Sequence, residues 1–293
     1  MGARGRAEGM ALRNLSRMIS KPQMTLDRVL SRYGVASRTV AREMIRAGRV
    51  RVNGRVQRDP DTWVATSNGL HANRAGQDFV QLDGQRLKPE RKVYLLFYKP
   101  KGVIVSHGDP SGRKTIYDYL GHSLDADRHR VNAKAGWLSP VGRLDKDTSG
   151  LLLLTNDTEF AHVVTDPDSG VPKTYLAKVS GLMSGEAVTQ LAGGVRMKRG
   201  DEARPLSVRR TEDRGKYTWL EIVLTEGKNR EVRRMVEAVG FKVLKLVRIA
   251  IGPLTLAGLE VGKSRPLTPA EVAAVRKGQK SGIRSRKREE QKV

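Results

Sequence analysis

The stretch VGRLDKDTSGLLLLTND, Val141–Asp157, places a small charged cluster directly before a run of four leucines. Asp145 and Asp147 lie in this cluster beside Arg143 and Lys146. A short apolar run bounded by turn residues is typical of a strand in the middle of a sheet. The charged cluster is therefore either a solvated turn or a polar site at the edge of that sheet.

The segments around this stretch predict an α+β domain built on a mainly antiparallel sheet with a few covering helices. In KTYLAKV, residues 173–179, alternate side chains point to opposite faces, as in a strand. In NREVRRMVEAVG, residues 229–240, apolar residues recur with the spacing of an amphipathic helix that ends at Gly240. The other predicted elements are strands at 94–98, 217–227 and 242–254, and helices at 115–120 and 158–164.

Two more polar clusters lie beside predicted strands. Lys173 and Tyr175 point to the same face of one strand, and Lys228 with Arg230 follows another. Three separate surface clusters would require three coincidences, whereas one site at the sheet edge requires a single arrangement. The sequence therefore favours one polar site, to which Arg143 and Asp145 also contribute.

Residues 24–85 predict a small separate module. A helix at 26–33 is followed by a second helix, for which Ser37 is a suitable N-cap. Asn53-Gly54 forms the turn of a predicted hairpin, and Asp83-Gly84 forms a second turn. Residues 61–90 complete the module and begin a linker.

Five arginines give this module a basic surface. Arg38, Arg42 and Arg46 recur every four residues and so line one face of the second helix, and Arg49 and Arg51 extend the positive charge onto the next strand. Most such runs are solvated helix faces. However, nine arginines against three acidic residues in residues 24–60 favour contact with RNA or DNA.

The composition of the whole chain also indicates a polyanionic partner. The formal net charge is +24 over 293 residues, which favours nucleic acid over an anionic membrane surface. The chain has no cysteine, which excludes a thiolate nucleophile, and its five histidines show no metal-ligand spacing. No apolar stretch is long enough to span a membrane.

The two ends of the chain are predicted to be disordered basic tails, at residues 1–23 and 276–293. The first tail is rich in arginine and nearly free of acids, and it lacks the apolar core of a secretory signal. An organellar targeting peptide is the alternative interpretation. Between the tails, we expect the module at 24–85 and a larger domain at 91–275.

Taken together, the motifs closely resemble the RsuA/RluB-type pseudouridine synthases. GRLDKDTSGLLLLTND is similar to the catalytic motif of that family, and SRTVAREMIRAGRVRVNG (37–54) resembles the S-four-type RNA-binding domain that precedes it. The resemblance covers roughly residues 24–270. The other matching motifs are YKPKGVIVS (98–106), KTYLAKV (173–179), EGKNREVRRM (226–235) and GPLTLAGLEVGKSRPL (252–267).

The resemblance implies a cofactor-free isomerisation of uridine to pseudouridine in ribosomal RNA or a pre-ribosomal particle. Asp145 would be the essential aspartate, acting either as a nucleophile or as a base. Tyr175 would stack on the flipped base, and Lys228 would pair with the aspartate, while Asp147 caps the turn. The implied RNA contacts in this domain are Arg143, Lys173, Arg230, Arg233 and Arg234.

The resemblance further implies a cytoplasmic, bacterial-type enzyme with no small-molecule cofactor. The histidine spacing predicts no metal site, and a monomer is the default expectation where the sequence leaves the oligomeric state open. EGKNREVRRM and the closing segment favour the large ribosomal subunit as the substrate. The loop at 121–140 is longer than the family requires and leaves the exact uridine open. Two alternatives remain: a non-catalytic RNA-binding factor for ribosome assembly on the same fold, and a pseudouridine synthase that acts on tRNA.

Overall fold

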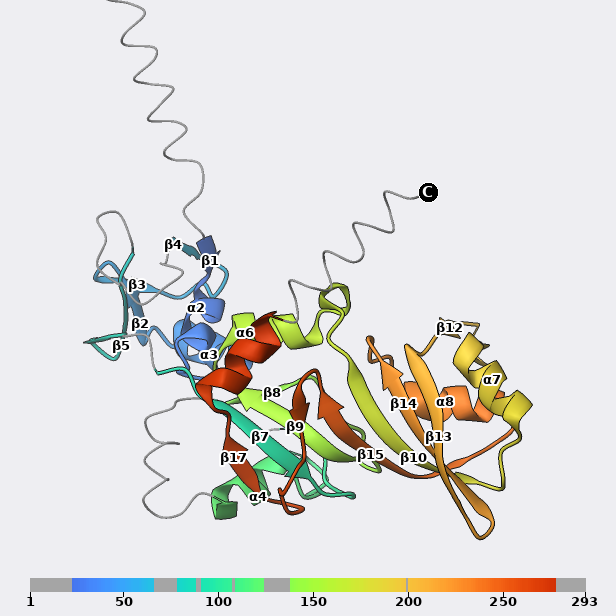
Figure 1. Cartoon of the computed structure of the whole chain (residues 1–293). Coiled ribbons are helices and arrows are strands. Elements are labelled where there is room, and N and C mark those ends of the chain that lie inside the picture. The colour runs from blue at the N-terminus through green and yellow to red at the C-terminus, as the bar shows by residue number, and fades with distance from the viewer. Residues whose placement is uncertain are drawn as a thin grey trace, which may run out of the picture. The chain divides into compact units, whose positions relative to one another are not determined.

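The computed structural model describes residues 23–65, 78–87, 91–106, 109–123, 138–198 and 200–277. The chain divides into two compact units between Arg91 and Lys92, each with a hydrophobic core of its own (Figure 1). Over these ranges, every helix is too short or too polar to cross a membrane. Residues 1–22, 124–137 and 278–293 lie outside the described ranges, and with them most of both predicted tails and of the predicted long loop.

The N-terminal unit consists of two helices and two small antiparallel sheets, with strand orders β1-β4 and β3-β2-β5-β6. Its elements are β1 (Gln23–Thr25), α2 (Leu26–Arg32), α3 (Arg38–Arg46), β2 (Val50–Val52), β3 (Arg55–Gln57), β4 (Trp63–Ala65), β5 (Val80–Leu82) and β6 (Gln85–Arg86). Gln23 therefore belongs to a strand and not to the predicted tail.

Local sequence explains the turns of this unit. The hydroxyl of Ser37 accepts a hydrogen bond from the amide of Val40 at 3.3 Å, which confirms the predicted N-cap of α3. Asn53 and Gly54 both adopt positive φ angles, 51° and 81°, as the tight hairpin turn between β2 and β3 requires. Asp83 and Gly84 repeat this conformation between β5 and β6.

The larger unit is built on a nine-stranded sheet of order β13-β14-β10-β15-β9-β7-β17, with β16 beside β15 and β8 beside β9. Its strands are β7 (Tyr94–Lys99), β8 (Ser139–Val141), β9 (Ser149–Thr155), β10 (Lys173–Ser180), β13 (Ser207–Arg214), β14 (Tyr217–Leu224), β15 (Val243–Ile251), β16 (Leu254–Thr255) and β17 (Ser264–Pro266). All pairs in this sheet are antiparallel except β15 with β9. This confirms the predicted α+β domain with a mainly antiparallel sheet.

The remaining elements of this unit are mostly helical. They are α4 (Ile116–Ser123), α6 (Thr158–Thr165), the 3-10 helix η1 (Pro167–Ser169), α7 (Gly185–Gly193), the short pair β11 (Val195–Arg196) and β12 (Glu202–Ala203), and α8 (Glu231–Ala238). A further helical segment covers residues 269–277. The predicted strand alternation of β10 is confirmed, since Lys173, Tyr175, Ala177 and Val179 are buried and the residues between them are less so.

Both faces of the sheet carry a hydrophobic core, because successive residues of β9 point to opposite sides. Leu152 and Leu154 belong to the core that α8 covers, whereas Leu151 and Leu153 belong to the core that α6 covers. The four leucines at residues 151–154 are thus buried, as predicted for a strand in the middle of a sheet. A strand packed on both sides is a rigid support for the loop that precedes it.

The C-terminal helical segment is fixed to the sheet by an ion pair. Arg276 donates to the Asp157 carboxylate at 2.7 Å, and Asp157 is also the N-cap of α6 and accepts the hydroxyl hydrogen of Tyr94. Residues 276 and 277 belong to this helical segment, although the sequence predicts that the disordered tail begins at 276. The correction has a simple cause: a basic residue near the chain end was counted as tail charge, and its acidic partner lies far away in the sequence.

Candidate active site

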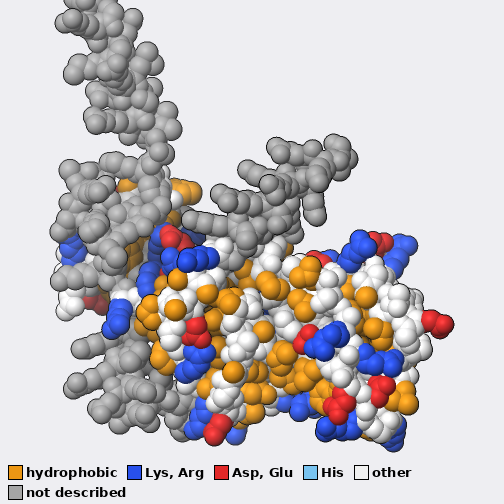
Figure 2. All heavy atoms as spheres, in the orientation of Figure 1, with side chains coloured by type: hydrophobic (Ala, Val, Ile, Leu, Met, Phe, Trp, Pro, Cys, Tyr) orange, Lys and Arg blue, Asp and Glu red, His pale blue; other side chains and the backbone are white. Residues whose placement is uncertain are grey.

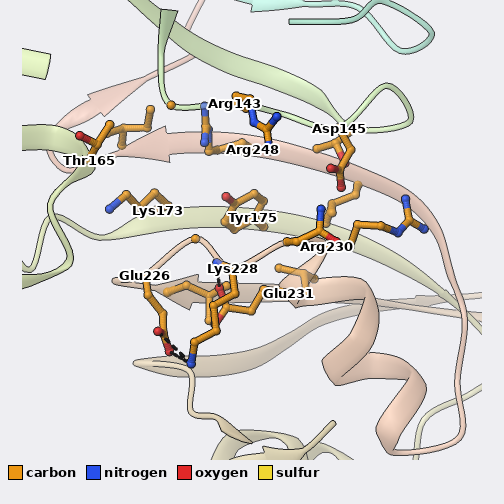
Figure 3. Close-up of a pocket in the computed structure, with 18 of the residues that line it drawn as sticks. Arg143, Asp145, Thr165, Lys173, Tyr175, Glu226, Lys228, Arg230, Glu231 and Arg248 are labelled. Atoms are coloured by element: carbon orange, nitrogen blue, oxygen red, sulfur yellow. Dashed lines mark hydrogen bonds and ion pairs between the residues drawn. The ribbon is translucent and has the colours of Figure 1, made fainter. Parts of the chain in front are cut away.

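A pocket of about 570 Å³ in the larger unit brings the three predicted polar clusters together (Figure 3). The loop between β8 and β9 supplies Arg143 and Asp145, and β10 supplies Lys173 and Tyr175. The segment between β14 and α8 supplies Lys228 and Arg230, and β15 adds Arg248. The three predicted clusters therefore meet in one pocket, but it lies over the central strands β10 and β15 and not at the edge of the sheet as predicted.

The loop that carries Asp145 is held by two buried cations. The ammonium of Lys99 donates to the carbonyl of Thr148 at 2.8 Å, and the guanidinium of Arg233 donates to the carbonyl of Asp147 at 3.0 Å. Both positive charges also interact electrostatically with Asp145. The side chain of Asp145 is half-buried and lines the pocket, and the backbone of its loop is held by the hydrogen bonds from Lys99 and Arg233.

Lys99 is a site residue that the sequence analysis missed. It is the last residue of β7 and is fully buried, and its ammonium also donates to the carbonyl of Pro100 at 2.9 Å. Burial lowers the pKa of Lys99 to about 8, against the opposing effect of Asp145 and Asp147. The sequence feature that could have identified Lys99 is its position at the end of an apolar strand, directly before a proline.

Lys228 does not pair with Asp145, which corrects the predicted role of this lysine. Its ammonium binds the Glu226 carboxylate at 3.1 Å and the carbonyl of Glu202 at 2.9 Å, and Figure 3 shows it pointing away from Asp145. Arg233 is the residue of the same motif whose charge acts on Asp145. The sequence could not distinguish the two cations, since the direction of each side chain depends on where α8 begins.

Asp147 also differs from the prediction. Its side chain is exposed, and among the described residues its carboxylate forms none of the expected hydrogen bonds to the local backbone. The turn is closed instead by the backbone amide of Thr148, which donates to the carbonyl of Asp145 at 3.1 Å. The contribution of Asp147 to the loop is its own carbonyl, the acceptor for Arg233.

The predicted RNA contacts of the larger unit fall into two groups. Arg143 and Arg230 are exposed at the pocket, and Arg230 adopts a φ of 50°, a left-handed conformation that is uncommon for arginine. Arg233 is buried, and Arg234 forms an ion pair with Asp201. Of these four residues, Arg143 and Arg230 have side chains open to a nucleic-acid backbone, whereas the side chains of Arg233 and Arg234 make contacts within the protein.

Tyr175, Lys173 and Arg248 form the wall of the pocket on the sheet. Tyr175 lies opposite Arg248 in the pairing of β10 with β15, and it belongs to the core on that face. Lys173 is buried and donates to the carbonyl of Thr225 at 2.9 Å. Burial first, and then the charge of Arg248, lowers the pKa of Lys173 to about 8. Lys173 was predicted to contact RNA, and the structure places it in the wall of the pocket.

Glu231, the first residue of α8, is a second residue that the sequence analysis missed. It is buried, and one carboxylate oxygen accepts a hydrogen bond from the amide of Lys228 at 2.9 Å, while the other has no partner within the described residues. Burial raises the pKa of Glu231 to about 7. A buried carboxyl at this position makes stability depend on pH near neutrality.

We expect the Glu231→Gln variant to lose less stability than the wild type between pH 5 and pH 8. The folded-state pKa of about 7 lies above the ordinary value of 4.5, so the folded chain keeps a proton that the unfolded chain has released. The stabilisation is complete below pH 4.5 and is lost as the pH rises through 7. We expect a difference of about 2 kcal/mol over this interval, allowing for solvent screening.

Urea unfolding of both proteins at pH 5 and at pH 8 measures this difference. The basic tails and the other titrating groups are common to both proteins and cancel in the comparison. An equal loss of unfolding free energy in the two proteins would show that Glu231 is ionised at neutral pH.

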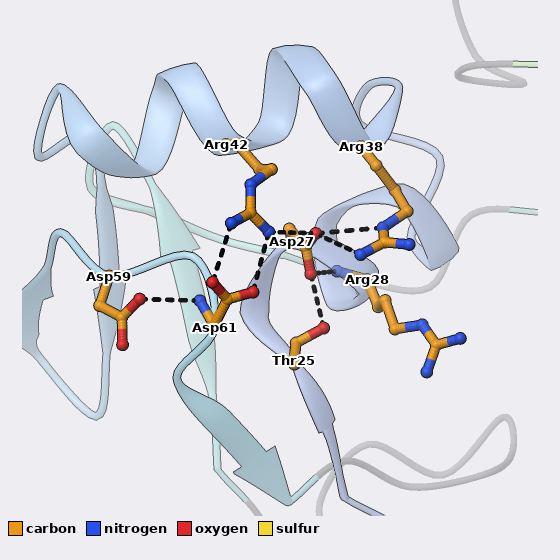
Figure 4. A network of polar contacts seen from close by, with 7 residues as sticks. All are labelled: Thr25, Asp27, Arg28, Arg38, Arg42, Asp59 and Asp61. Atoms are coloured by element: carbon orange, nitrogen blue, oxygen red, sulfur yellow. Dashed lines mark hydrogen bonds and ion pairs between the residues drawn. The ribbon is translucent and has the colours of Figure 1, made fainter.

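The basic face of the N-terminal unit is partly neutralised by acidic residues (Figure 4). Asp27 is fully buried and accepts hydrogen bonds from Arg38 at 2.8 Å and Arg42 at 3.1 Å, and Arg42 also binds Asp61. Burial alone would raise the pKa of Asp27, but these bonds and one from Thr25 outweigh it and hold the pKa below the usual value.

The other three arginines of that face differ in their contacts. Arg49 binds Asp83 at 2.6 Å, and Arg51 donates to the carbonyl of Gly54 at 3.3 Å. Arg46 is exposed and has no side-chain partner within the described residues. The residues needed for an RNA-binding surface are therefore present, but Arg38, Arg42 and Arg49 also have a structural role.

Elsewhere on the larger unit, basic and acidic side chains alternate. Figure 2 shows lysine and arginine mixed with aspartate and glutamate around the hairpin of β13 and β14. Arg209 pairs with Glu221, and Arg214 pairs with Glu212. Within the described ranges, no cluster of histidine, aspartate and glutamate could hold a metal ion.

Comparison with known proteins identifies both units. Residues 93–238 match the family model described as RNA pseudouridylate synthase, and residues 24–66 match the S4 domain. The chain is 39% identical over 252 residues to the ribosomal large subunit pseudouridine synthase B of Bacillus subtilis (strain 168), covering 86% of this chain and 95% of that protein.

Two further relatives agree with this result. The ribosomal large subunit pseudouridine synthase B of Yersinia pestis is 36% identical over 237 residues, covering 79% of this chain and 68% of that protein. A solved structure titled "Crystal structure of pseudouridylate synthase" superposes with a TM-score of 0.57 at 26% identity, covering 86% of this chain and 99% of that one.

Proposed function

Because the chain belongs to the RNA pseudouridylate synthase family, we propose that it converts a uridine of large-subunit ribosomal RNA to pseudouridine, with Asp145 as the essential group. The observation that carries the proposal is the pocket in which Asp145 faces Tyr175. The choice of substrate rests on the names of the relatives from Bacillus subtilis and Yersinia pestis.

The reaction is an isomerisation. The bond between C1′ of the ribose and N1 of uracil breaks, and a bond between C1′ and C5 forms. The hydrogen on C5 leaves as a proton, and N1 takes up a proton, so no oxidant and no cofactor is consumed. The protein must hold the nucleotide, provide a group that reacts with it, and keep the detached base in place while it turns.

The residues of the pocket suit these tasks. Asp145 is a half-buried carboxylate on a fixed loop, and it can act on the nucleotide as a nucleophile or as a base. The aromatic ring of Tyr175 offers a surface on which a base that has left its helix can stack. Lys99 and Arg233 hold the loop and counterbalance the negative charge of the carboxylate.

The exposed arginines supply the attraction to the RNA backbone. Arg143 and Arg230 lie at the pocket, where phosphates next to the target nucleotide would pass. In the N-terminal unit, Arg46 and Arg51 are exposed, and that unit matches the S4 domain, so we assign it a role in positioning the substrate.

A comparison of three RNA classes tests the proposed function. The purified protein is incubated with unmodified transcripts of large-subunit rRNA, small-subunit rRNA and tRNA, and pseudouridine is mapped by primer extension after carbodiimide treatment. We expect one new stop, in large-subunit rRNA. A stop only in another class would correct the substrate, and no stop in any class would favour a non-catalytic RNA-binding factor.

A further inference from the structure

The wall of the pocket on the sheet contains two cations on neighbouring strands, Lys173 and Arg248. Figure 3 shows Tyr175 between Asp145 on one side and Lys173 on the other. Lys173 precedes Tyr175 by two residues on β10, so both side chains lie on the same face of the sheet. Arg248 is the partner of Tyr175 on β15, and it also lines the pocket. The aromatic ring thus separates the carboxylate from Lys173, while Arg248 lies beside the ring on the neighbouring strand.

These two cations lack the partners that buried charges usually have. Only 8% of Lys173 and 5% of Arg248 is exposed, and neither forms an ion pair within the described residues. The Nε of Arg248 donates to the carbonyl of Leu151 at 2.8 Å, but one terminal nitrogen, Nη2, has no acceptor. An unmade hydrogen bond of a buried donor costs about 1–3 kcal/mol, more for a charged group.

Lys173 has hydrogen-bonding capacity left as well. Its ammonium has three protons, and the structure provides one acceptor, the carbonyl of Thr225. Glu231 lines the same pocket and favours the charged form of Lys173 without forming an ion pair with it. The pocket therefore contains unused donors and buried positive charge, a combination that suits a ligand with acceptor oxygens.

The position of these donors indicates the base of the target nucleotide. If Asp145 acts on the nucleotide and the base stacks on Tyr175, the edge of the base farthest from the ribose points toward Lys173, and Arg248 lies along the side of the base. Uracil has carbonyl oxygens at C2 and C4, and both accept hydrogen bonds. A phosphate is the alternative anion, but the sugar–phosphate backbone must run along the exposed part of the site, where Arg143 and Arg230 lie.

The chemistry gives the cations a further task. When the C1′–N1 bond breaks, its electron pair stays on the base, and the negative charge spreads over the two carbonyl oxygens. Fixed positive charges on buried residues such as Lys173 and Arg248 stabilise such a charge far more than charges in water do. The charge disappears when C5 has bonded to C1′, the C5 proton has left and N1 is protonated.

We propose that Lys173 and Arg248 bind the carbonyl oxygens of the target uracil and stabilise the negative charge that the base carries when it is detached; this proposal rests on the proposed function. It also explains selectivity, because cytosine has an amino group at C4. That group is a donor, and placing it against buried donors leaves both unpaired.

A combination of enzyme variants and altered substrates tests this proposal. Once the target uridine is mapped, the RNA is made with uridine, 2-thiouridine or 4-thiouridine at that position, because sulfur is a much weaker acceptor than oxygen. The enzymes are the wild type, Lys173→Met, and Arg248→Lys, which keeps the charge but loses the planar fork. Lys178→Met is the matched control, since it removes the same charge from the opposite face of β10.

We expect the wild type to react about tenfold or more slowly with at least one thio substrate in single-turnover experiments, because one hydrogen bond to a charged donor is weakened. Lys173→Met is expected to react about 100-fold more slowly with unaltered RNA, at nearly unchanged RNA affinity. In each pocket variant the effect of sulfur should shrink to less than about threefold at the carbonyl position that the replaced residue binds, because the bond that sulfur weakens is already missing there. Lys178→Met should behave as the wild type.

Two results would overturn the proposal. One is a sulfur effect that stays as large as in the wild type at both carbonyl positions in both pocket variants, and the other is a wild type that tolerates sulfur at both positions. Thermal unfolding shows whether each variant is folded, and Arg248→Lys remains informative if Lys173→Met is not. Failure of the proposed function is a separate outcome, since the wild type would then form no pseudouridine in unaltered RNA.

Discussion

Replacing Asp145 with asparagine is expected to lower the rate of pseudouridine formation by at least about a thousandfold, because it removes the reacting carboxylate. Asparagine has nearly the same shape, and the loop is held through the backbone carbonyls of Asp147 and Thr148. We therefore expect the variant to fold and to bind RNA as the wild type does. Carbodiimide primer extension measures the product, and a filter-binding assay measures RNA affinity.

Asp147→Asn is the matched control for this variant. Asp147 lies on the same loop, but its carboxylate is exposed and its structural contact is made by its backbone carbonyl. The substitution removes the same charge and should change the rate by less than about threefold. Equal activity of Asp145→Asn and the wild type would refute the assignment, and loss of activity in both variants would indicate a shared role of the two carboxylates.

Gly150→Ala is expected to destabilise the larger unit by about 3 kcal/mol, the upper end of the range typical of forced overlap in a core. Gly150 has a φ of 116°, and a Cβ at this position would lie 2.3 Å from the backbone oxygen of Arg248 and 2.5 Å from its backbone nitrogen. Backbone atoms cannot move aside without separating β9 from β15, the parallel pair of the sheet. Because β9 supports the loop of Asp145 and β15 carries Arg248, activity should fall as well.

Gly142→Ala separates the two causes of the destabilisation, the positive φ angle of the glycine and the overlap of an added Cβ with the neighbouring backbone. Gly142 also has a positive φ, 73°, but a Cβ there would meet only the Thr165 methyl group at 3.7 Å. Its cost should be about 1 kcal/mol, from backbone conformation alone. Urea unfolding of both variants measures the difference, and equal destabilisation would mean that the close approach of β9 and β15 relaxes without cost.

The sequence predicts the elements well where a pattern extends over many residues. The alternation of β10, the apolar stripe of α8 and the two tight turns of the N-terminal unit were all predicted and are all present. These features follow from local rules of side-chain direction and backbone conformation. The meeting of three polar segments in one pocket was also predicted, because each lies next to a strand.

The prediction fails where a side chain must be paired with a distant one. Lys228 was predicted to pair with Asp145, but its ammonium forms an ion pair with Glu226. Lys99 and Arg248 were missed because a charged residue in an apolar strand is normally assumed to reach solvent. The tertiary structure decides which cations are buried, and no spacing in the sequence contains that information.

The predicted basic surface of the N-terminal unit was overestimated for the same reason, because ion pairs with distant residues were not foreseen. Arg38, Arg42 and Arg49 were counted as free positive charge, yet they bind Asp27, Asp61 and Asp83. The carboxylates lie well apart from these arginines in the sequence, so a local charge count treats them as independent. The predicted basic surface is consequently smaller than its arginine content indicates, with Arg46 and Arg51 still exposed.

The release of hydrogen from C5 of uridine is the most direct measurement of the central claim. Large-subunit rRNA is transcribed with uridine tritiated at C5 and incubated with the purified wild type, and the tritium that enters water is counted. The account predicts release that levels off at one tritium per rRNA molecule with the wild type and no release with Asp145→Asn. Release equal in the two proteins, or no release from large-subunit rRNA by the wild type, would contradict it.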